Sequence, residues 1–295
     1  MKMRRAVLYE QEDLRIEECE VPEIGEGDVL VKNKISATCG TDVKIYKRGY
    51  PLLKPPHPFG HEYSGVIAAV GKKVKNFKEG DRVAVHNTAP CNHCYFCKKG
   101  FPSMCEDMLF NRGTYAEYVK VPERIVKQNM FLLDESISHK NACLMEPFSC
   151  AVYGIEECPI HLGDVVAVNG AGPIGLMFIA LLKANGCRKI IVSEPIEHRR
   201  NLALKIGATR VVNSDTEDLQ KIVKEETDGL GVDYCVEAVA AMLVDCVYLV
   251  RPHGKILQFG HDELARPEFP VAELLKNEIE VYGGYLGKYY MRKVA

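Results

Sequence analysis

The chain has 295 residues, of which 47% are hydrophobic and 26% are charged, and its formal net charge is −2. This length allows two domains that each bury a core, and the balanced charge argues against nucleic-acid binding and against a charged, disordered tail. The longest apolar run, residues 174–182, is too short to span a bilayer, and the N-terminus shows no apolar segment with a cleavage site for secretion. We therefore expect a soluble protein with no membrane partner.

Residues 1–148 show short strand patterns separated by turns. Alternating or β-branched residues predict strands at 4–9, 14–19, 28–35, 63–70, 81–85 and 114–121. Glycine and acidic residues at 25–28 and 79–81 predict turns, and the prolines within residues 50–58 predict an extended loop. This half is expected to be a barrel-like β domain with long loops.

Candidate metal ligands occur at the ends of these strands. Cys39 follows one predicted strand, and His61 and Glu62 directly precede the next. Thiolate, imidazole and carboxylate are zinc ligands, and three mixed ligands with one open position are typical of a catalytic zinc site. Glu146, where the β-rich half ends, is a further candidate ligand. Each residue alone could be a buried thiol, a loop histidine or a helix N-terminal carboxylate, but together they predict a catalytic zinc site.

A second metal site is predicted by Cys91, Cys94, Cys97 and Cys105, which have the spacing C-x2-C-x2-C-x7-C. Four thiolates close in sequence are typical of a closed, tetrahedral structural zinc site, here holding a lobe of about residues 88–108 together. Two disulfides are the alternative, but they are less expected in a large chain without a secretion signal. His93 is expected to be a spare side chain. The other cysteines lie mostly in apolar stretches, which favours buried thiols and a reducing cytoplasm.

From residue 149 onwards strands alternate with helices. Strands are predicted at 165–169, 189–193, 210–213, 232–237, 254–259 and 279–282, and helices at 174–185 and 197–206. Six strands with intervening helices predict an α/β fold with a doubly wound parallel sheet.

A dinucleotide-binding turn follows the first of these strands, with the sequence Gly170-Ala171-Gly172-Pro173-Ile174-Gly175. The three glycines would allow a tight turn, close approach of the pyrophosphate and close helix–strand packing, and the helix N-terminus would attract the phosphates. Glu194 ends the next strand, where a carboxylate accepts hydrogen bonds from ribose and repels a 2′-phosphate. The pattern predicts NAD rather than NADP. Arg199, close to Glu194, is a further cofactor-binding candidate that would weaken this preference. A purely structural turn is the alternative.

These motifs resemble the zinc-containing medium-chain alcohol dehydrogenase superfamily, in particular its polyol and threonine dehydrogenase branch. The resemblance is carried by residues 39–42 (Cys-Gly-Thr-Asp), residues 60–65 (Gly-His-Glu-Tyr-Ser-Gly), the four cysteines, Glu146-Pro147 and the glycine turn. It implies a GroES-like catalytic domain over residues 1–148 and a Rossmann NAD-binding domain over residues 149–295, with the active site in the cleft between them. It also implies a homodimer or homotetramer, and Thr41 as the hydroxyl that passes the alcohol proton towards solvent.

The chain departs from the family pattern in three respects. The stretch between Cys105 and Tyr115 is shorter than is usual in the family, and Glu237 to Arg251 is slightly compressed. Lys44 stands where members often have histidine, at the outer end of the proton path. Relatives also continue beyond the position of Ala295, so the resemblance predicts a chain shortened at its C-terminus, with residues 288–295 beginning an amphipathic helix.

The function expected from these features is NAD-dependent oxidation of a secondary alcohol to a ketone, with one catalytic and one structural zinc ion per chain. The substrate would be a polyol, a cyclitol or a sugar-derived alcohol. The alternatives are an enzyme resembling L-threonine 3-dehydrogenase and a shortened, non-catalytic protein that still binds NAD and zinc.

Overall fold

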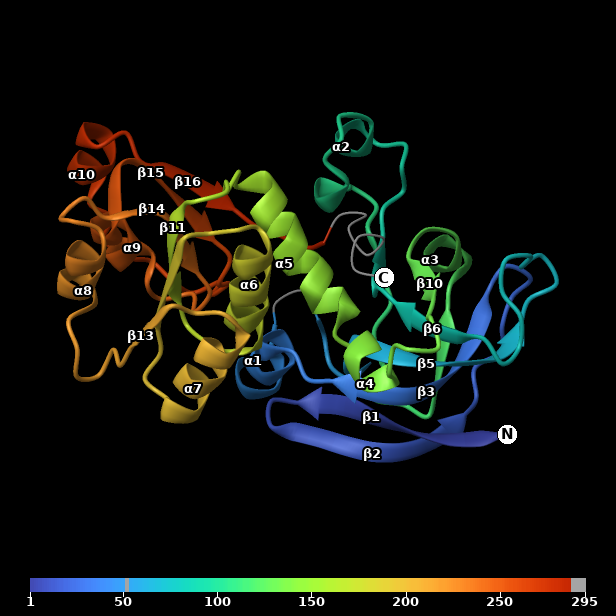
Figure 1. Cartoon of the computed structure of the whole chain (residues 1–295). Helices are drawn as coiled ribbons and strands as arrows, with labels where there is room; N and C mark the ends of the chain where they lie inside the picture. Colours follow the sequence, from blue (N-terminus) through green and yellow to red (C-terminus); the bar gives the residue numbers. More distant parts are fainter. Residues whose placement is uncertain (51–52, 288–295) are drawn as a thin grey trace. The chain divides into compact units, whose positions relative to one another are not determined.

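The computed structural model describes residues 1–50 and 53–287 (Figure 1). The helix expected at residues 288–295 lies outside the described residues, as do two residues of the predicted proline-rich loop. The described chain divides into two compact units, Met1–Ser149 together with Gly287, and Cys150–Leu286.

The first unit is rich in short β-strands. In chain order its elements are β1 (Lys2–Glu10), β2 (Asp13–Glu20), β3 (Val29–Ala37), α1 (Gly40–Arg48), β4 (His57–Pro58), β5 (Glu62–Val70), β6 (Arg82–Val85), β7 (Thr88–Ala89), α2 (Tyr95–Lys98), the 3₁₀ helix η1 (Pro102–Met104), β8 (Leu109–Phe110), β9 (Tyr118–Val121), α3 (Glu123–Gln128), β10 (Met130–Leu132), α4 (His139–Ala142) and the start of α5 (Met145–Glu157). Its described strands form an antiparallel sheet in the order β10-β6-β5-β3-β9, a smaller sheet β2-β1-β4 and the pair β7-β8.

The largest hydrophobic cluster of this unit lies on one face of the larger sheet. Alternate strand residues such as Val29, Val31 and Val83 are buried there with Ile125 of α3. The period of two is the one that places every second side chain on the same face of a strand. The strand predicted at 114–121 is shorter than expected, because Tyr115 and Glu117 exchange backbone hydrogen bonds with β1 and with the residue before Gly60 instead of extending β9.

The second unit is a doubly wound α/β fold, as predicted. Its elements after α5 are β11 (Val165–Asn169), α6 (Pro173–Ala184), β12 (Lys189–Ser193), α7 (Glu197–Ile206), β13 (Arg210–Val212), α8 (Leu219–Glu226), β14 (Val232–Glu237), α9 (Leu243–Leu249), β15 (Val250–Gln258), α10 (Val271–Lys276) and β16 (Glu280–Gly283). Within the described residues the strands form one parallel sheet in the order β13-β12-β11-β14-β15-β16.

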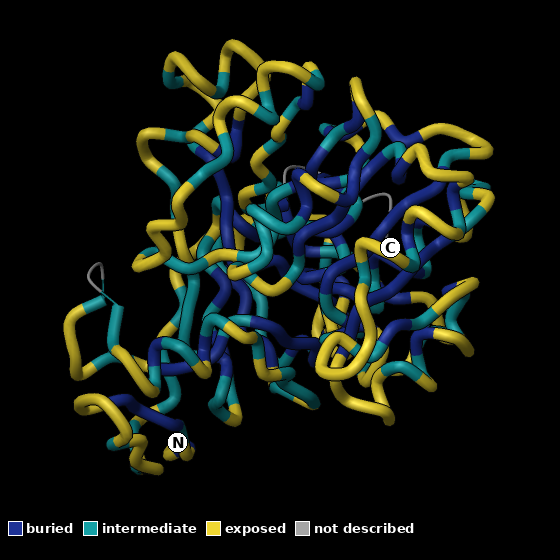
Figure 2. The backbone as a smooth tube through the Cα atoms, turned by 90° about the vertical axis from the view of Figure 1, so that its left-hand side faces the viewer, coloured by how far each residue is buried: buried dark blue, intermediate teal, exposed yellow. Residues whose placement is uncertain are grey.

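Both faces of this sheet are covered by helices, which explains why β11 is apolar at consecutive positions. Val166 and Val168 pack with side chains of α6 and α7, whereas Val165 and Ala167 pack with side chains of α8 and α9. Figure 1 shows α6 and α8 on opposite sides of the strands, and the buried strand residues belong to the dark blue segments of Figure 2. Among the described helices, none is long and apolar enough to cross a membrane.

Candidate functional site

Strand pairing in the first unit brings Cys39 close to His61 and Glu62. Strands β3 and β5 are antiparallel, and their register places Ala37 opposite Glu62. Cys39 lies two residues beyond Ala37, so it lies beside the start of β5. The ligand atoms of Cys39, His61 and Glu62 all lie within 4.8 Å of one another. The structure thus brings together three residues predicted from distant parts of the sequence.

Gly60 sets the direction in which the chain enters this group. It has φ +86°, and a Cβ at this position would lie 2.5 Å from the Tyr115 ring. Only glycine combines this backbone conformation with so close a neighbour at low cost. The turn therefore fixes the backbone of the following His61.

Helix α1 begins at the metal-ligand group, with Cys39 as its N-cap. The backbone N–H of Thr41 donates to Cys39 Sγ over 3.4 Å, and the backbone N–H of Cys39 donates to Asp42 Oδ2 over 3.0 Å. Thr41 therefore lies in the first turn of the helix, beside the thiol. Lys44 lies one turn further along α1 and is partly exposed.

Asp42 orients His61, a role that the sequence analysis did not assign. The Nδ1–H of His61 donates to Asp42 Oδ1 over 3.0 Å, and the Asp42 side chain is 3% exposed. When Nε2 loses its proton to a metal, Nδ1–H stays on Asp42, the arrangement that is common for histidine ligands. The capping pattern Cys39-x-x-Asp42 is the signal in the sequence that could have predicted a fixed Asp42.

The charges around His61 and Glu62 match those of a cation site. Burial lowers the pKa of His61, but hydrogen bonds to Asp42 and Cys39 and the charge of Glu146 outweigh it and raise the pKa to about 11. Burial raises the pKa of Glu62 to about 7, and Glu146 adds to the rise. Both groups share this buried space with the negative charge of Glu146. A divalent cation would offset this charge, so the donor set fits zinc.

The charge of Glu146 acts on His61 and Glu62, and its carboxylate also lies beside His86. The distance from Glu146 Oε1 to His86 Nε2 is 3.5 Å, and both side chains are buried. Glu146 is not part of the three-residue group whose ligand atoms lie within 4.8 Å of one another. Glu146 instead belongs to a second group, with His86 and Cys150, whose ligand atoms also lie within 4.8 Å of one another. The sequence analysis did not consider His86 or Cys150 as partners of Glu146.

Cys91, Cys94, Cys97 and Cys105 converge on a second point, with all four sulfur atoms within 4.8 Å of one another. The Cys91–Cys97 and Cys94–Cys105 sulfur–sulfur distances are both 4.0 Å. A disulfide needs about 2.05 Å, whereas tetrahedral zinc with bonds of about 2.3 Å needs about 3.8 Å between sulfurs. All twelve cysteines of the chain are free thiols in the structure. The geometry fits a metal and does not show the alternative of two disulfides.

The four thiols also influence one another electrostatically. The backbone N–H of Cys97 lowers the pKa of Cys94, whereas burial and the neighbouring Cys94 raise the pKa of Cys97. Adjacent thiolates repel one another, and a bound cation would remove that penalty. His93 lies outside the four-sulfur group and hydrogen-bonds through Nδ1 to the carbonyl of Cys91 over 2.9 Å.

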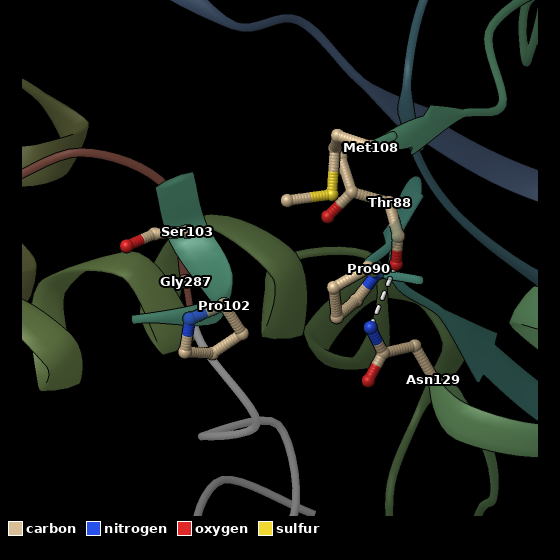
Figure 3. A pocket seen from close by; sticks show the side chains of 7 residues that line it. All are labelled: Thr88, Pro90, Pro102, Ser103, Met108, Asn129 and Gly287. Carbon is tan, nitrogen blue, oxygen red and sulfur yellow. Dashed lines mark hydrogen bonds between the residues drawn. The ribbon is translucent and has the colours of Figure 1, made fainter. Parts of the chain in front are cut away.

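A small pocket lies next to this cysteine segment and is shown in Figure 3. Its lining residues are Thr88, Pro90, Pro102, Ser103, Met108, Asn129 and Gly287. The space accommodates about one water molecule. The pocket is therefore too small to be a substrate site.

In the second unit, the glycine turn between β11 and α6 has the geometry that a dinucleotide requires. A Cβ at Gly175 would lie 2.0 Å from the carbonyl oxygen of Gly170, so this glycine permits close helix–strand packing. A Cβ at Gly172 would have no described atom within 4 Å, which leaves space for a ligand to approach the backbone. Pro173 is the first residue of α6, where its missing N–H costs nothing, and Ile174 packs against the core. The turn fits a pyrophosphate at the N-terminus of α6.

Glu194 follows β12 directly, and its carboxylate is 3% exposed. One carboxylate oxygen accepts the backbone N–H of Ala171 over 2.8 Å, and the other accepts that of Ile196 over 3.0 Å. Arg199 Nη1 lies 3.7 Å from the same carboxylate. Glu194 therefore links the glycine turn to the following segment, and each oxygen retains a second lone pair for another donor.

Both halves of the chain match known protein families. Residues 25–129 match the alcohol dehydrogenase GroES-like domain, and residues 173–295 match the zinc-binding dehydrogenase family. The chain is 34% identical over 291 residues to sorbitol dehydrogenase of Bacillus subtilis, with 95% of this chain and 81% of that protein covered. It is 39% identical over 236 residues to L-threonine 3-dehydrogenase of Caldanaerobacter subterraneus, with 78% and 67% covered.

The fold is also similar to that of an alcohol dehydrogenase from Escherichia coli whose structure contains NADH. The TM-score is 0.90 at 29% identity, with 99% of this chain and 86% of that chain covered. The expectations of a GroES-like domain, a Rossmann domain, zinc and NAD are thereby confirmed. The chain belongs to the zinc-containing medium-chain alcohol dehydrogenase superfamily and is a zinc-dependent alcohol or polyol dehydrogenase.

Proposed function

We propose that this enzyme oxidises a secondary alcohol of a polyol, a cyclitol or a sugar-derived substrate to a ketone, with NAD as the hydride acceptor. Residues 1–148 would form the catalytic domain and residues 149–295 the NAD-binding domain. The observation that carries the proposal is the convergence of Cys39, His61 and Glu62, because this mixed donor set is typical of a catalytic rather than a structural zinc.

Within this proposal the residues divide into three tasks. Cys39, His61 and Glu62 would hold the catalytic zinc, with Glu146 as a nearby further carboxylate, while Cys91, Cys94, Cys97 and Cys105 would hold the structural zinc. When bound, zinc lowers the pKa of an alcohol and NAD accepts a hydride. Gly170, Gly172, Pro173, Ile174, Gly175, Glu194 and Arg199 would bind the dinucleotide.

The protein side chains contribute orientation and a proton path. Asp42 holds the His61 ring in one tautomer over a 3.0 Å hydrogen bond, so the ring does not need to reorient during turnover. Thr41 lies in the first turn of α1 beside Cys39. Its hydroxyl would accept the proton released by the alcohol and pass it towards solvent.

L-Threonine is the second candidate substrate. The 39% identity to L-threonine 3-dehydrogenase favours it, and the 34% identity to sorbitol dehydrogenase over more of the chain favours a polyol. Lys44 also favours a polyol, because the resemblance implies histidine at this position in threonine dehydrogenases.

We also propose that the enzyme forms a homodimer or homotetramer and acts in the cytoplasm. The oligomer is suggested by the family. The cytoplasm is suggested by the twelve free cysteines, since a reducing compartment keeps thiols unpaired.

A substrate panel tests the proposal. Purified, zinc-loaded protein is mixed with NAD and with polyols, cyclitols, sugar alcohols or L-threonine, and NADH formation is followed by absorbance. We expect turnover with one or more polyols, loss of activity with a chelator and recovery when zinc is returned. If only L-threonine is turned over, L-threonine and not a polyol is the substrate. Turnover that a chelator leaves unchanged would refute the catalytic zinc.

Glu194→Gln is expected to reduce the preference for NAD over NADP by about 10-fold, because hydrogen bonds to a charged group contribute roughly 1.5–3 kcal/mol and the charge also repels a 2′-phosphate. Glutamine keeps the side-chain volume and one acceptor oxygen, so only one of the two N–H groups, of Ala171 or Ile196, keeps its acceptor. The measurement is kcat/KM with each cofactor. Glu197→Gln, an exposed carboxylate on α7, is the control. If the ratio of kcat/KM with NAD to that with NADP is unchanged in Glu194→Gln, Glu194 does not bind the ribose.

A further inference from the structure

His86 is a fully buried histidine to which the proposed chemistry gives no role. It follows β6 directly, and its relative exposure is 0%. Its Nε2 lies 3.5 Å from Oε1 of Glu146, which is itself 7% exposed. Within the described residues, this nitrogen makes no hydrogen bond. A buried polar nitrogen without a partner is energetically costly, and a hydrogen bond to Glu146 would remove that cost.

The short turn that carries His86 is held firmly by its surroundings. The backbone N–H of His86 donates to the Asn129 carbonyl over 2.9 Å. The side-chain amide of Asn129 donates to the Thr88 carbonyl over 2.7 Å, as Figure 3 shows. Asn129 is 2% exposed, and its two hydrogen bonds hold both ends of the turn. The imidazole ring has little freedom to move away from Glu146.

Thr88 determines which ring nitrogen carries the proton. The backbone N–H of Thr88 donates to His86 Nδ1 over 3.1 Å, and the Thr88 hydroxyl lies 3.0 Å from the same atom. A nitrogen that accepts an N–H cannot itself carry a proton. The neutral ring must therefore carry its proton on Nε2, the atom that faces Glu146.

We propose that His86 is the positioning residue of Glu146, to whose carboxylate it donates Nε2–H. This hydrogen bond would fix the orientation of the Glu146 carboxylate and keep it beside His61 and Glu62 as a further ligand of the catalytic zinc. This inference rests on the proposed catalytic zinc. The present 3.5 Å separation is only slightly longer than a hydrogen bond of about 2.7–3.2 Å.

The same tautomer disfavours direct metal binding by His86. A histidine ligand binds metal through the lone pair of a deprotonated nitrogen. In His86 the lone pair of Nδ1 is used by Thr88, and Nε2 carries the proton. In this tautomer His86 supports a carboxylate. Zinc binding by His86, Glu146 and Cys150, whose ligand atoms lie within 4.8 Å of one another, would require the proton to leave Nε2.

Two substitutions of His86 test the roles of its two nitrogen atoms separately. His86→Asn keeps an acceptor near the Nδ1 position for the Thr88 N–H but has no group that reaches Glu146. His86→Gln keeps a donor near the Nε2 position. The affinity for zinc is measured on the full chain by competition with a chelator, with the metal content of each variant determined. Cys39→Ala identifies which of the bound zinc ions belongs to the catalytic group.

The zinc ion of the catalytic group is the one that is lost in Cys39→Ala. We expect His86→Asn to lower the affinity for this ion by 10- to 100-fold, the range typical for loss of an outer hydrogen-bond partner of a metal ligand. His86→Gln is expected to stay close to the wild-type affinity. In a Glu146→Gln background, His86→Asn should have no further effect, because the acceptor of the hydrogen bond has already changed.

Equal affinities of His86→Asn and the wild type would overturn the proposal. Equal losses in both His86 variants, or an additional loss in the Glu146→Gln background, would assign His86 a purely structural role. If His86→Asn fails to fold, the test rests on His86→Gln. Because this variant retains a donor to Glu146, a loss of zinc affinity as large as that of Glu146→Gln would contradict the proposal. A Cys39→Ala protein that still binds every zinc ion would refute the proposed catalytic site itself, independently of His86.

Discussion

Cys39→Ala is expected to abolish turnover while the protein continues to bind NAD. Cys39 supplies the thiolate of the three-ligand group and caps α1 through its contact with the Thr41 N–H. Removing it leaves one imidazole and one carboxylate, too few to hold a catalytic zinc. We expect kcat to fall by more than about 100-fold, beyond what loss of an outer-shell partner costs. The glycine turn belongs to the other compact unit and remains intact.

The measurement is steady-state turnover together with NAD binding by fluorescence or calorimetry, and zinc content per chain. Cys19→Ala is the matched control, because Cys19 lies on β2 of the same unit and belongs to neither metal group. The control should keep full activity and both zinc ions. A Cys39→Ala enzyme with wild-type turnover, or one that loses NAD binding and turnover together, would contradict the separation of tasks between the two units.

Cys94→Ala is expected to destabilise the protein rather than to act on the chemistry directly. Cys94 lies within 4.8 Å of three further thiols, and only short elements, α2 and the 3₁₀ helix η1, structure this segment. Few buried apolar side chains hold it, so metal bonds would supply much of its stability. We expect the free energy of unfolding to fall by at least about 2 kcal/mol, as losses of metal sites commonly produce.

Calorimetry and limited proteolysis of residues 88–108 measure this effect. His93→Ala is the control, because His93 lies in the same segment but outside the four-sulfur group. It should keep the wild-type melting temperature and zinc content. A Cys94→Ala protein with an undisturbed melting temperature would argue against a structural zinc. If His93→Ala loses zinc as well, the ligand set contains more than the four cysteines.

The α/β half was the part of the fold that the sequence predicted best. The helix expected at 197–206 has the observed bounds of α7, Glu197–Ile206, and the strand expected at 165–169 is β11. These elements are signalled by local apolar runs and by a glycine stop at Gly207. The strand expected at 254–259 begins earlier in the structure, at Val250, because Val232 of β14 pairs with Val250 before the register shifts.

The β-rich half was predicted less completely. The short strands β4, β7 and β8 have only two residues each, so no alternation of side chains reveals them. Helix α1 was also missed, although its N-cap is the predicted ligand Cys39. These elements form because long-range pairings and caps hold them, and propensity over a short window does not report such contacts.

The sequence by itself determined the family, the two kinds of fold and the inventory of metal donors. Those features are local: cysteine spacing, the Gly-His-Glu run and a glycine turn between a strand and a helix are each contained in a few residues. Only the tertiary structure decided which donors meet. The register of β3 against β5 brings Cys39 to His61 and Glu62, and the folding of β6 and α5 places His86 against Glu146. The physical reason is that a donor set is defined by distances of a few ångströms, which strand register and buried hydrogen bonds fix across many residues of intervening chain.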